Sequence, residues 1–210
     1  MNRVLYWLWL TSKNYISSTK ITCLLERFET IEEIYNSKDY NNIKLINERE
    51  KRILMDKSLD EAENIFKRTE ELGAKILVFD DKDFPDRLRN IIDPPYVLYV
   101  KGEIMNWDRL FTIGVVGTRT CGDYGKIVTA NICRDLTKAG VTIVSGMARG
   151  IDTIAGTTAI KNGGKTIAVL GSGIDVIYPP ENKGVYYSIH LVNFPLYIIP
   201  SFPVFLYFFY

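Results

Sequence analysis

Histidine and cysteine are scarce in this chain of 210 residues. There is a single histidine, His190, and the three cysteines, Cys23, Cys121 and Cys133, are widely spaced with no C-x-x-C pair. Chemistry that needs a histidine base, or several imidazole or thiolate ligands, is therefore not expected, and no metal site is predicted. Unpaired, widely spaced cysteines are typical of a reduced, cytoplasmic compartment.

The chain also lacks an excess of either charge. Lys and Arg together number 26 against 25 Asp and Glu, which gives a formal net charge of +1. Overall basicity therefore does not point to nucleic acid, and any affinity for anions must be local. With 47% hydrophobic and 24% charged residues, the composition is that of an ordinary globular protein.

Complete nucleotide-binding motifs are missing as well. The segment GGKT at residues 163–166 resembles the end of a P-loop, but Ala159 stands where the first glycine belongs. The segment GSG at residues 171–173 lacks the third glycine of a dinucleotide fingerprint, because Val176 occupies that position. Neither ATP nor NAD is supported, and we expect no cofactor.

What the sequence does contain is a repeated pattern between Phe111 and Asn182. Three apolar runs each reach a glycine: FTIGVVG (111–117), VTIVSG (141–146) and KTIAVLG (165–171). Runs that are apolar throughout favour strands of a parallel sheet, buried on both faces. The segments 125–138 and 151–162 are long enough for crossover helices, each followed by a glycine suited to a helix end. A β-α-β-α-β unit is predicted.

Three regions follow from the pattern along the whole chain. Residues 1–72 predict a small helical domain of the SAM or helix-hairpin type, because their apolar residues recur at helical spacing. Two further strands are expected at 74–80 and 96–102, before the first glycine run. The fold class is therefore α/β: a partial, extended Rossmann-like parallel sheet over residues 73–183, incomplete at the C-terminus. Residues 184–210 form an aromatic, apolar tail.

The loops after the three glycine-ended strands are the candidate site. In a parallel sheet these loops open on one edge, beside helix N-termini whose free N–H groups attract anions. Gly117, Gly146 and Gly171 at this edge would let the backbone approach a phosphate closely. The alternative is that these glycines only end strands and form tight turns.

Four segments in order identify a family that the chain resembles. They are FPDRLRNIIDPPYVLYVKG (84–102), GVVGTRTCGDYG (114–125), TIVSGMARGIDTIA (142–155) and GGKTIAVLGSGIDVIYPPEN (163–182). The chain resembles the DNA processing protein A (DprA/Smf) family over about residues 1–182. The resemblance implies a cytoplasmic, homodimeric protein that binds single-stranded DNA. It implies that the protein protects incoming strands in natural transformation, hands them to the recombinase RecA, and has no catalytic activity.

Carried onto this sequence, the resemblance assigns DNA-binding residues to the three loops. Arg119 lies where the family has the arginine of a G-S-R loop that contacts phosphate, and Arg149 is a second candidate contact. The predicted DNA-binding residues are Gly117, Thr118, Arg119, Ser145, Gly146, Arg149, Gly150, Gly171, Ser172 and Gly173. Asp152 is expected to cap the following helix, because a carboxylate repels phosphate. Tyr124 and Tyr178 either stack on bases or pack in the core.

Two other functions remain open. A Rossmann-like enzyme that cleaves a nucleoside monophosphate would also use glycine loops and Arg119, with Asp152 or Asp175 as the carboxylate aimed at the ribose. Alternatively, the chain is a non-functional fragment, because strands expected after Gly171 are absent and an open sheet edge favours aggregation.

The tail departs from the family pattern. It holds no Asp, Glu, Lys or Arg after Lys183, and Pro195, Pro200 and Pro203 interrupt its apolar run. A membrane helix, an aromatic docking segment and out-of-frame translation of an AT-rich gene are the three interpretations. The last is favoured here, so we expect truncation of the family fold after about residue 182, loss of its dimer interface and no membrane contact.

Overall fold

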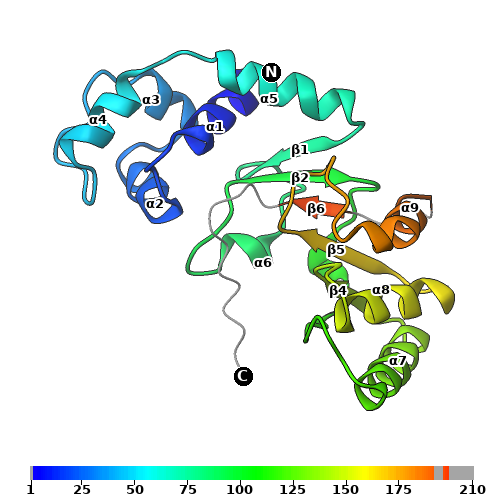
Figure 1. Cartoon of the computed structure of the whole chain (residues 1–210). Coiled ribbons are helices and arrows are strands. Elements are labelled where there is room, and N and C mark those ends of the chain that lie inside the picture. Colours follow the sequence, from blue (N-terminus) through cyan, green and yellow to red (C-terminus); the bar gives the residue numbers. More distant parts are fainter. Residues whose placement is uncertain (1, 192–195, 199–210) are drawn as a thin grey trace. The chain divides into compact units, whose positions relative to one another are not determined.

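A computed structural model describes residues 2–191 and 196–198. The chain divides into two compact units, Met1–Leu98 and Tyr99–Tyr210, which are described separately below. The sequence-based domain boundary after residue 72 remains a prediction. Helices and parallel strands alternate in the second unit, so the predicted α/β, Rossmann-like fold class is confirmed (Figure 1).

The first unit is mainly helical. Its elements are α1 (Asn2–Ser12), α2 (Ser18–Arg27), α3 (Ile31–Asn36), α4 (Glu48–Met55), α5 (Asp60–Glu71), β1 (Lys75–Val78) and α6 (Asp86–Arg89). The expected helices near the N-terminus and the strand at β1 are confirmed. Helix α4 was not predicted, although a capping box marks its start: Asn47 accepts from the Glu50 amide, and the Glu50 carboxylate accepts from the Asn47 amide.

Aromatic side chains form the centre of the first unit. Trp7 and Trp9 on α1 are each 1% exposed, and the Trp7 ring stacks on Tyr96 with 5.5 Å between ring centres. Each indole N–H has an acceptor: Trp7 donates to the Asp80 carboxylate at 2.9 Å, and Trp9 donates to the Asp56 carbonyl at 2.8 Å. The apolar residues of these helices are thus core positions, as their spacing predicts.

The second unit holds the parallel sheet. Strand β2 (Val97–Lys101) crosses into it from the first unit, and its other elements are β3 (Thr112–Gly114), α7 (Asp123–Lys138), β4 (Thr142–Ser145), α8 (Ile151–Lys161), β5 (Thr166–Leu170), α9 (Lys183–Leu191) and β6 (Leu196–Ile198). Within this unit the strand order is β2-β6-β5-β4-β3. Strands β3, β4, β5 and β6 run parallel, and β2 pairs antiparallel with β6. The predicted β-α-β-α-β unit is therefore confirmed.

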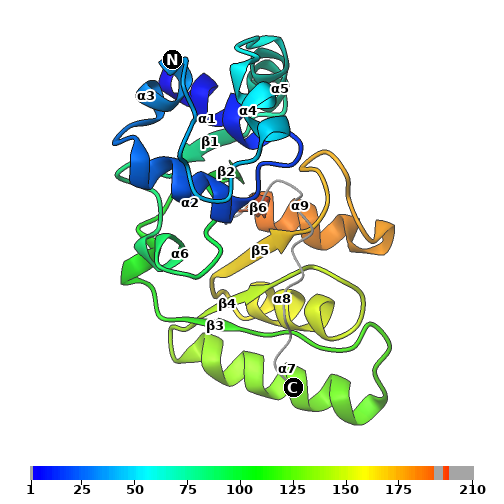
Figure 2. The ribbon, with the colours of Figure 1, turned by 90° about the vertical axis from the view of Figure 1, so that its left-hand side faces the viewer.

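Helices α7 and α8 cover β4 and pack against each other, as both ribbon views show (Figure 2). Between them lies a small core whose members are all fully buried: Cys133, Ile143, Ala155 and Ala159. Alanines at two successive turns of α8 let its backbone approach the sheet closely. This packing fixes where α8 begins, and hence where the loop before it lies.

One sequence expectation about burial was wrong. The run 111–117 was predicted to form a strand buried on both faces, but Phe111 is 84% exposed and all three residues of β3 are exposed. The physical reason is its position: β3 is the outermost strand, paired with β4 alone in the described part of the second unit. Strands β4 and β5 lie inside the sheet and are largely buried, as predicted.

The tail begins with regular structure. Helix α9 occupies residues 183–191, and β6 adds a strand beside β5. The predicted membrane and docking interpretations concern residues 191–210, most of which lie outside the described residues. None of the helices in the described ranges has the length and apolar character that a bilayer crossing requires.

Candidate nucleic-acid interface

Three loops meet at one edge of the sheet in the second unit. They are the segments 115–122, 146–150 and 171–179, which follow β3, β4 and β5 respectively. Because the three strands are parallel and adjacent, their carboxyl ends lie on the same side of the sheet, and Gly117, Gly146 and Gly171 stand in the loops that follow them. We call these three loops together the rim.

Asp152, in the first turn of α8, holds the first two loops of the rim together. It is 7% exposed, and its carboxylate accepts a hydrogen bond from the Gly146 amide at 3.1 Å. Burial raises the pKa of the Asp152 carboxyl, and the backbone amides of Gly146, Ala148 and Gly117 oppose the rise. Instead of simply capping its helix, Asp152 therefore fixes two loops.

Glycine is required at two rim positions because the loops touch. A Cβ atom on Gly150, whose φ is +75°, would lie 2.2 Å from the Thr118 carbonyl oxygen. A Cβ atom on Gly117 would lie 2.7 Å from the Cγ1 atom of Ile151. The Ile151 amide also donates to the Thr118 carbonyl at 3.2 Å. Close contact between loops, rather than turn formation alone, explains these glycines.

Asn182 joins the third loop to the second. Asn182 is 3% exposed, and its side-chain amide donates to the Met147 carbonyl and to the Thr153 hydroxyl, both at 2.7 Å. The Thr153 hydroxyl in turn donates to the Ala148 carbonyl at 2.7 Å. A buried amide with several partners is costly to move, so the end of the third loop is fixed beside the second loop.

Several predicted DNA-contacting groups are already hydrogen-bonded within the rim. The Ser145 hydroxyl donates to the Val115 carbonyl at 2.7 Å, and the Thr118 hydroxyl donates to the Thr120 carbonyl at 2.9 Å. The Gly146 amide is bonded to a carboxylate, as described above. The expectation of freely available backbone and hydroxyl donors at these positions is therefore not met. These groups shape the rim, and contact with DNA at these positions stays a prediction.

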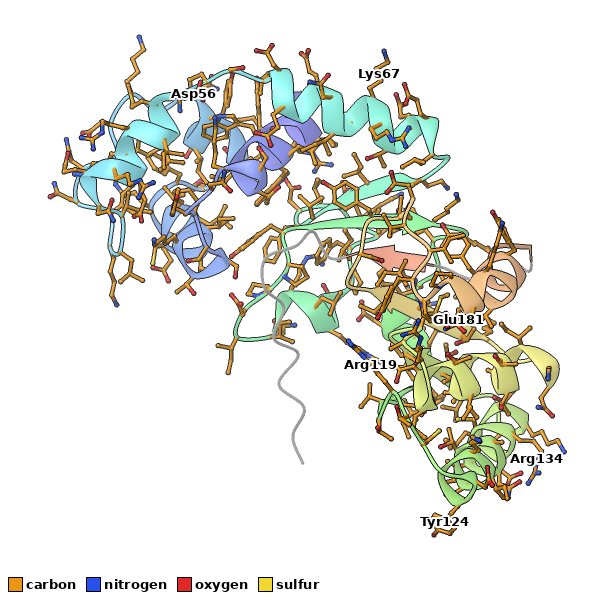
Figure 3. All side chains as sticks on the ribbon, viewed as in Figure 1. Asp56, Lys67, Arg119, Tyr124, Arg134 and Glu181 are labelled. Carbon is orange, nitrogen blue, oxygen red and sulfur yellow. The ribbon has the colours of Figure 1, made fainter. Side chains whose placement is uncertain are left out.

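Arg119 lies on the first loop with an exposed side chain. Figure 3 shows it extending from this loop away from α7. In the described part of the chain no carboxylate pairs with it, so its guanidinium N–H donors are not taken up by an ion pair there. An exposed arginine on a fixed loop is suited to bidentate recognition of a phosphate.

Arg149 lies on the second loop but is paired. Its Nη2 atom is 3.1 Å from Oε1 and 3.5 Å from Oε2 of Glu181, and its guanidinium lies 5.9 Å from the centre of the Tyr178 ring. The pKa of the Glu181 carboxyl is lowered by a hydrogen bond from the backbone amide of Glu181 and, in addition, by the charge of Arg149. The Glu181 carboxylate is thus an anion in contact with Arg149, a residue predicted to bind phosphate.

The remaining predicted residues are accessible. Gly171 and Gly173 are exposed, Ser172 is half-buried, and no atom lies within 4 Å of a Cβ built on Gly171. Tyr124 is 83% exposed, so the core-packing alternative for it is wrong. Figure 3 shows Tyr124 at the outer side of α7, apart from Arg119.

Sequence reasoning missed the residues that hold the rim together. The roles of Asn182 and Glu181 depend on contacts between segments more than thirty residues apart, which no local pattern encodes. Asp152 was named from the sequence, but its bond to the Gly146 amide was not predicted. A weak signal existed in the segment YPPEN, where polar residues directly follow two prolines and a glycine loop.

Fold and rim together define a Rossmann-like protein with an arginine-bearing loop edge. The family model for DNA recombination-mediator protein A matches residues 75–198. The chain therefore belongs to the DNA recombination-mediator protein A family. The match continues past Asn182, where the sequence resemblance was expected to end, and it includes α9 and β6.

Relatives with curated names support the same family. Protein Smf of Synechocystis is 41% identical over 57% of this chain, and DNA processing protein DprA of Bacillus subtilis is 39% identical over 53%. Protein Smf of Borreliella burgdorferi is 32% identical over 72% of this chain. The chain spans 31%, 38% and 51% of the lengths of these three relatives, respectively.

Two solved structures are similar to this one. DNA processing protein A from Streptococcus pneumoniae gives a TM-score of 0.69 at 26% identity, covering 94% of this chain and 67% of that protein. DNA processing protein A from Helicobacter pylori, whose structure was described for its single-stranded DNA binding mode, gives 0.53 at 30% identity, covering 62% and 57%.

Proposed function

We propose that the rim of the second unit binds single-stranded DNA by its phosphates, without reading the base sequence. The observation that carries the proposal is Arg119, an exposed guanidinium without a carboxylate partner in the described residues. Its loop is held by hydrogen bonds from the Ser145 hydroxyl to the Val115 carbonyl and from the Ile151 amide to the Thr118 carbonyl. Family membership and the single-stranded DNA binding of the Helicobacter pylori relative support it. The ten DNA-binding residues named from the sequence, nine in the rim and Ser145 at the end of β4, remain the proposed contact set.

The mechanism is electrostatic and passive. Arg119 holds one phosphate through parallel N–H donors, and Arg149 holds a neighbouring one. The backbone around Gly171 and Ser172 is open enough for a strand to pass closely. Contacts of this kind neutralise phosphates and release counterions, so binding weakens steeply with added salt.

A nucleotide-cleaving enzyme is less well supported by the rim. Such an enzyme needs a carboxylate that is free to reach the ribose. The Asp152 carboxylate is buried and accepts a hydrogen bond from the Gly146 amide, so it serves the loops instead. Binding, rather than catalysis, is the function that we propose.

Further proposals rest on family membership alone. We propose that the protein acts in the cytoplasm, protects incoming strands in natural transformation and hands them to RecA. Stimulation of RecA-dependent ATP hydrolysis on strands coated with a single-strand binding protein would test the last step. Homodimer formation is also a family expectation, which sedimentation of the purified chain would test.

Replacing Arg119 tests the proposed function directly. We expect Arg119→Ala to weaken binding of a fluorescent oligothymidine about ten- to a hundredfold, because a charge-assisted phosphate contact contributes about 1.5–3 kcal/mol. The slope of log affinity against log salt should flatten by about 0.7. Fluorescence anisotropy at several salt concentrations measures both quantities.

A matched control is Arg134→Ala, which removes the same charge from α7. Figure 3 shows Arg134 away from Arg119, and it pairs with Asp135 at 2.9 Å. Affinity should change little in this variant. Equal binding by wild type and Arg119→Ala would contradict the proposal, and preferential binding of a free nucleoside monophosphate would favour the enzyme alternative.

A further inference from the structure

The contact between Arg149 and Glu181 places an anion at a proposed phosphate position. Both Glu181 carboxylate oxygens lie within 3.5 Å of Nη2 of Arg149. The two side chains are 50% and 64% exposed, so the pair is open to solvent and to an incoming strand. A carboxylate and a phosphate oxygen make the same kind of charge-assisted bond to a guanidinium.

The surrounding structure holds this pair in place. Asn182, the next residue, is anchored to the Met147 carbonyl and the Thr153 hydroxyl, so the backbone at Glu181 stays beside the second loop. The Arg149 guanidinium also lies over the Tyr178 ring. A pair whose members are already positioned loses less side-chain entropy on forming than a pair between two free surface residues.

The Glu181 carboxylate and a DNA phosphate therefore compete for the same donors of Arg149. A guanidinium that meets a carboxylate cannot offer the same N–H donors to a phosphate at the same time. For a phosphate to bind Arg149 at this position, Glu181 must leave, and its charge then faces the polyanion. Both effects lower the affinity of the rim.

We infer that Glu181 is an internal competitor for phosphate that sets the affinity of the rim through Arg149. This inference rests on the proposed function, and it adds a residue that regulates the same site. Arg119 and Arg149 then differ in role. The first has no carboxylate partner in the described residues, whereas the Nη2 donors of the second become available to a phosphate only when Glu181 is displaced.

The test is a gain of affinity on replacing Glu181. Glu181→Gln keeps the shape of the side chain and removes its charge. We expect the variant to bind a fluorescent oligothymidine about two- to fivefold more tightly, because an exposed ion pair changes an equilibrium constant by about that factor. The salt dependence should steepen by about 0.7, because Arg149 then neutralises a phosphate instead of a carboxylate.

Asp135→Asn is the matched control. It removes the same charge from an exposed ion pair, because Asp135 pairs with Arg134 on α7, away from the rim. Its affinity should equal that of the wild type. A gain in this control as large as in Glu181→Gln would show a general charge effect and overturn the inference.

A double-mutant cycle separates competition at Arg149 from local repulsion. If Glu181 acts mainly through Arg149, the gain from Glu181→Gln should be much smaller in an Arg149→Ala background, where only repulsion by the Glu181 charge remains. A gain as large as in the wild-type background would overturn the inference. If Arg119→Ala weakens binding and Glu181→Gln changes nothing, the inference fails while the proposed function stands; if Arg119→Ala also has no effect, the proposed function fails.

Discussion

Two buried tryptophans of the first unit and two buried polar side chains of the second unit use their hydrogen bonds differently. The indole N–H groups of Trp7 and Trp9 donate to Asp80 and to the Asp56 carbonyl within a densely aromatic interior. In the second unit, Asp152 and Asn182 bond to the backbone of the rim.

The comparison distinguishes buried polar groups that stabilise a core from buried polar groups that position surface loops. A polar group that completes a core stabilises its own unit and leaves the surface unaffected. A polar group that fixes two loops stabilises the arrangement of whatever those loops carry, here Arg119 and Arg149. The two units should therefore respond differently to substitution, in stability for the first and in both stability and binding for the second.

The largest expected effect is loss of stability on replacing Trp7. Trp7→Ala removes a buried ring that stacks on Tyr96, so we expect the free energy of unfolding of the first unit to fall by about 3–5 kcal/mol. Hydrogen exchange followed by mass spectrometry should show faster exchange in residues 2–98 than in the wild type. The rim amides should keep their protection.

Trp7→Phe is the control for this variant. It keeps an aromatic ring and loses the indole hydrogen bond to Asp80, so its effect should be smaller. If the Gly146 amide lost protection as strongly as the first unit in Trp7→Ala, the two units would unfold together and the contrast between them would not hold.

A smaller effect on stability, joined by an effect on binding, is expected at Gly150. Gly150→Ala combines a positive φ with an approach of 2.2 Å to the Thr118 carbonyl oxygen, so we expect a loss of up to about 3 kcal/mol. Displacement of the first loop should also weaken oligothymidine binding. Thermal unfolding and anisotropy measure the two effects.

Gly140→Ala is the control for Gly150→Ala. Gly140 has a φ of +82° but no atom within 4 Å of a Cβ built on it, so this variant tests backbone strain alone, at about 1–2 kcal/mol. DNA affinity should be unchanged. Equal effects of the two substitutions on binding would argue against contact between the loops as the reason for Gly150.

The smallest effect is the pH dependence contributed by Lys57 in the first unit. Its ammonium lies 4.8 Å from the ring centres of Trp9 and Tyr40 and 5.5 Å from that of Tyr35. Burial lowers the pKa of Lys57 from 10.5 to about 8. Between these values the unfolded chain binds more protons than the folded one, so this group makes stability rise with pH above about 8.

Lys57→Met isolates that contribution. The difference in unfolding free energy between wild type and variant should rise from about pH 8 to about pH 10, measured by urea denaturation. Above that range tyrosines such as Tyr40, whose pKa is raised by burial, act in the opposite direction. Parallel pH profiles for the two proteins would contradict the assignment to Lys57.

Local patterns in the sequence predict the elements of this fold well. Continuous apolar runs placed β4 and β5, and glycines with positive φ at Gly140 and Gly163 follow α7 and α8 as expected. The same pattern failed for the burial of β3, since an apolar run carries no information on whether a neighbouring strand is present on each side.

The site was predictable only in part, for a similar reason. The positions of Gly117, Gly146 and Gly171 follow from parallel topology, which apolar runs and crossover lengths indicate. Pairing of Arg149 with Glu181 depends on a contact across 32 positions, which a single sequence does not display.

The exposed outer side of β3 has a consequence for the reach of the rim. A further parallel strand laid against β3 would end at the same edge of the sheet. The loop that follows such a strand would emerge beside Arg119, on the side opposite Arg149. A polypeptide that docks there would therefore extend the edge that carries Arg119 by one more loop.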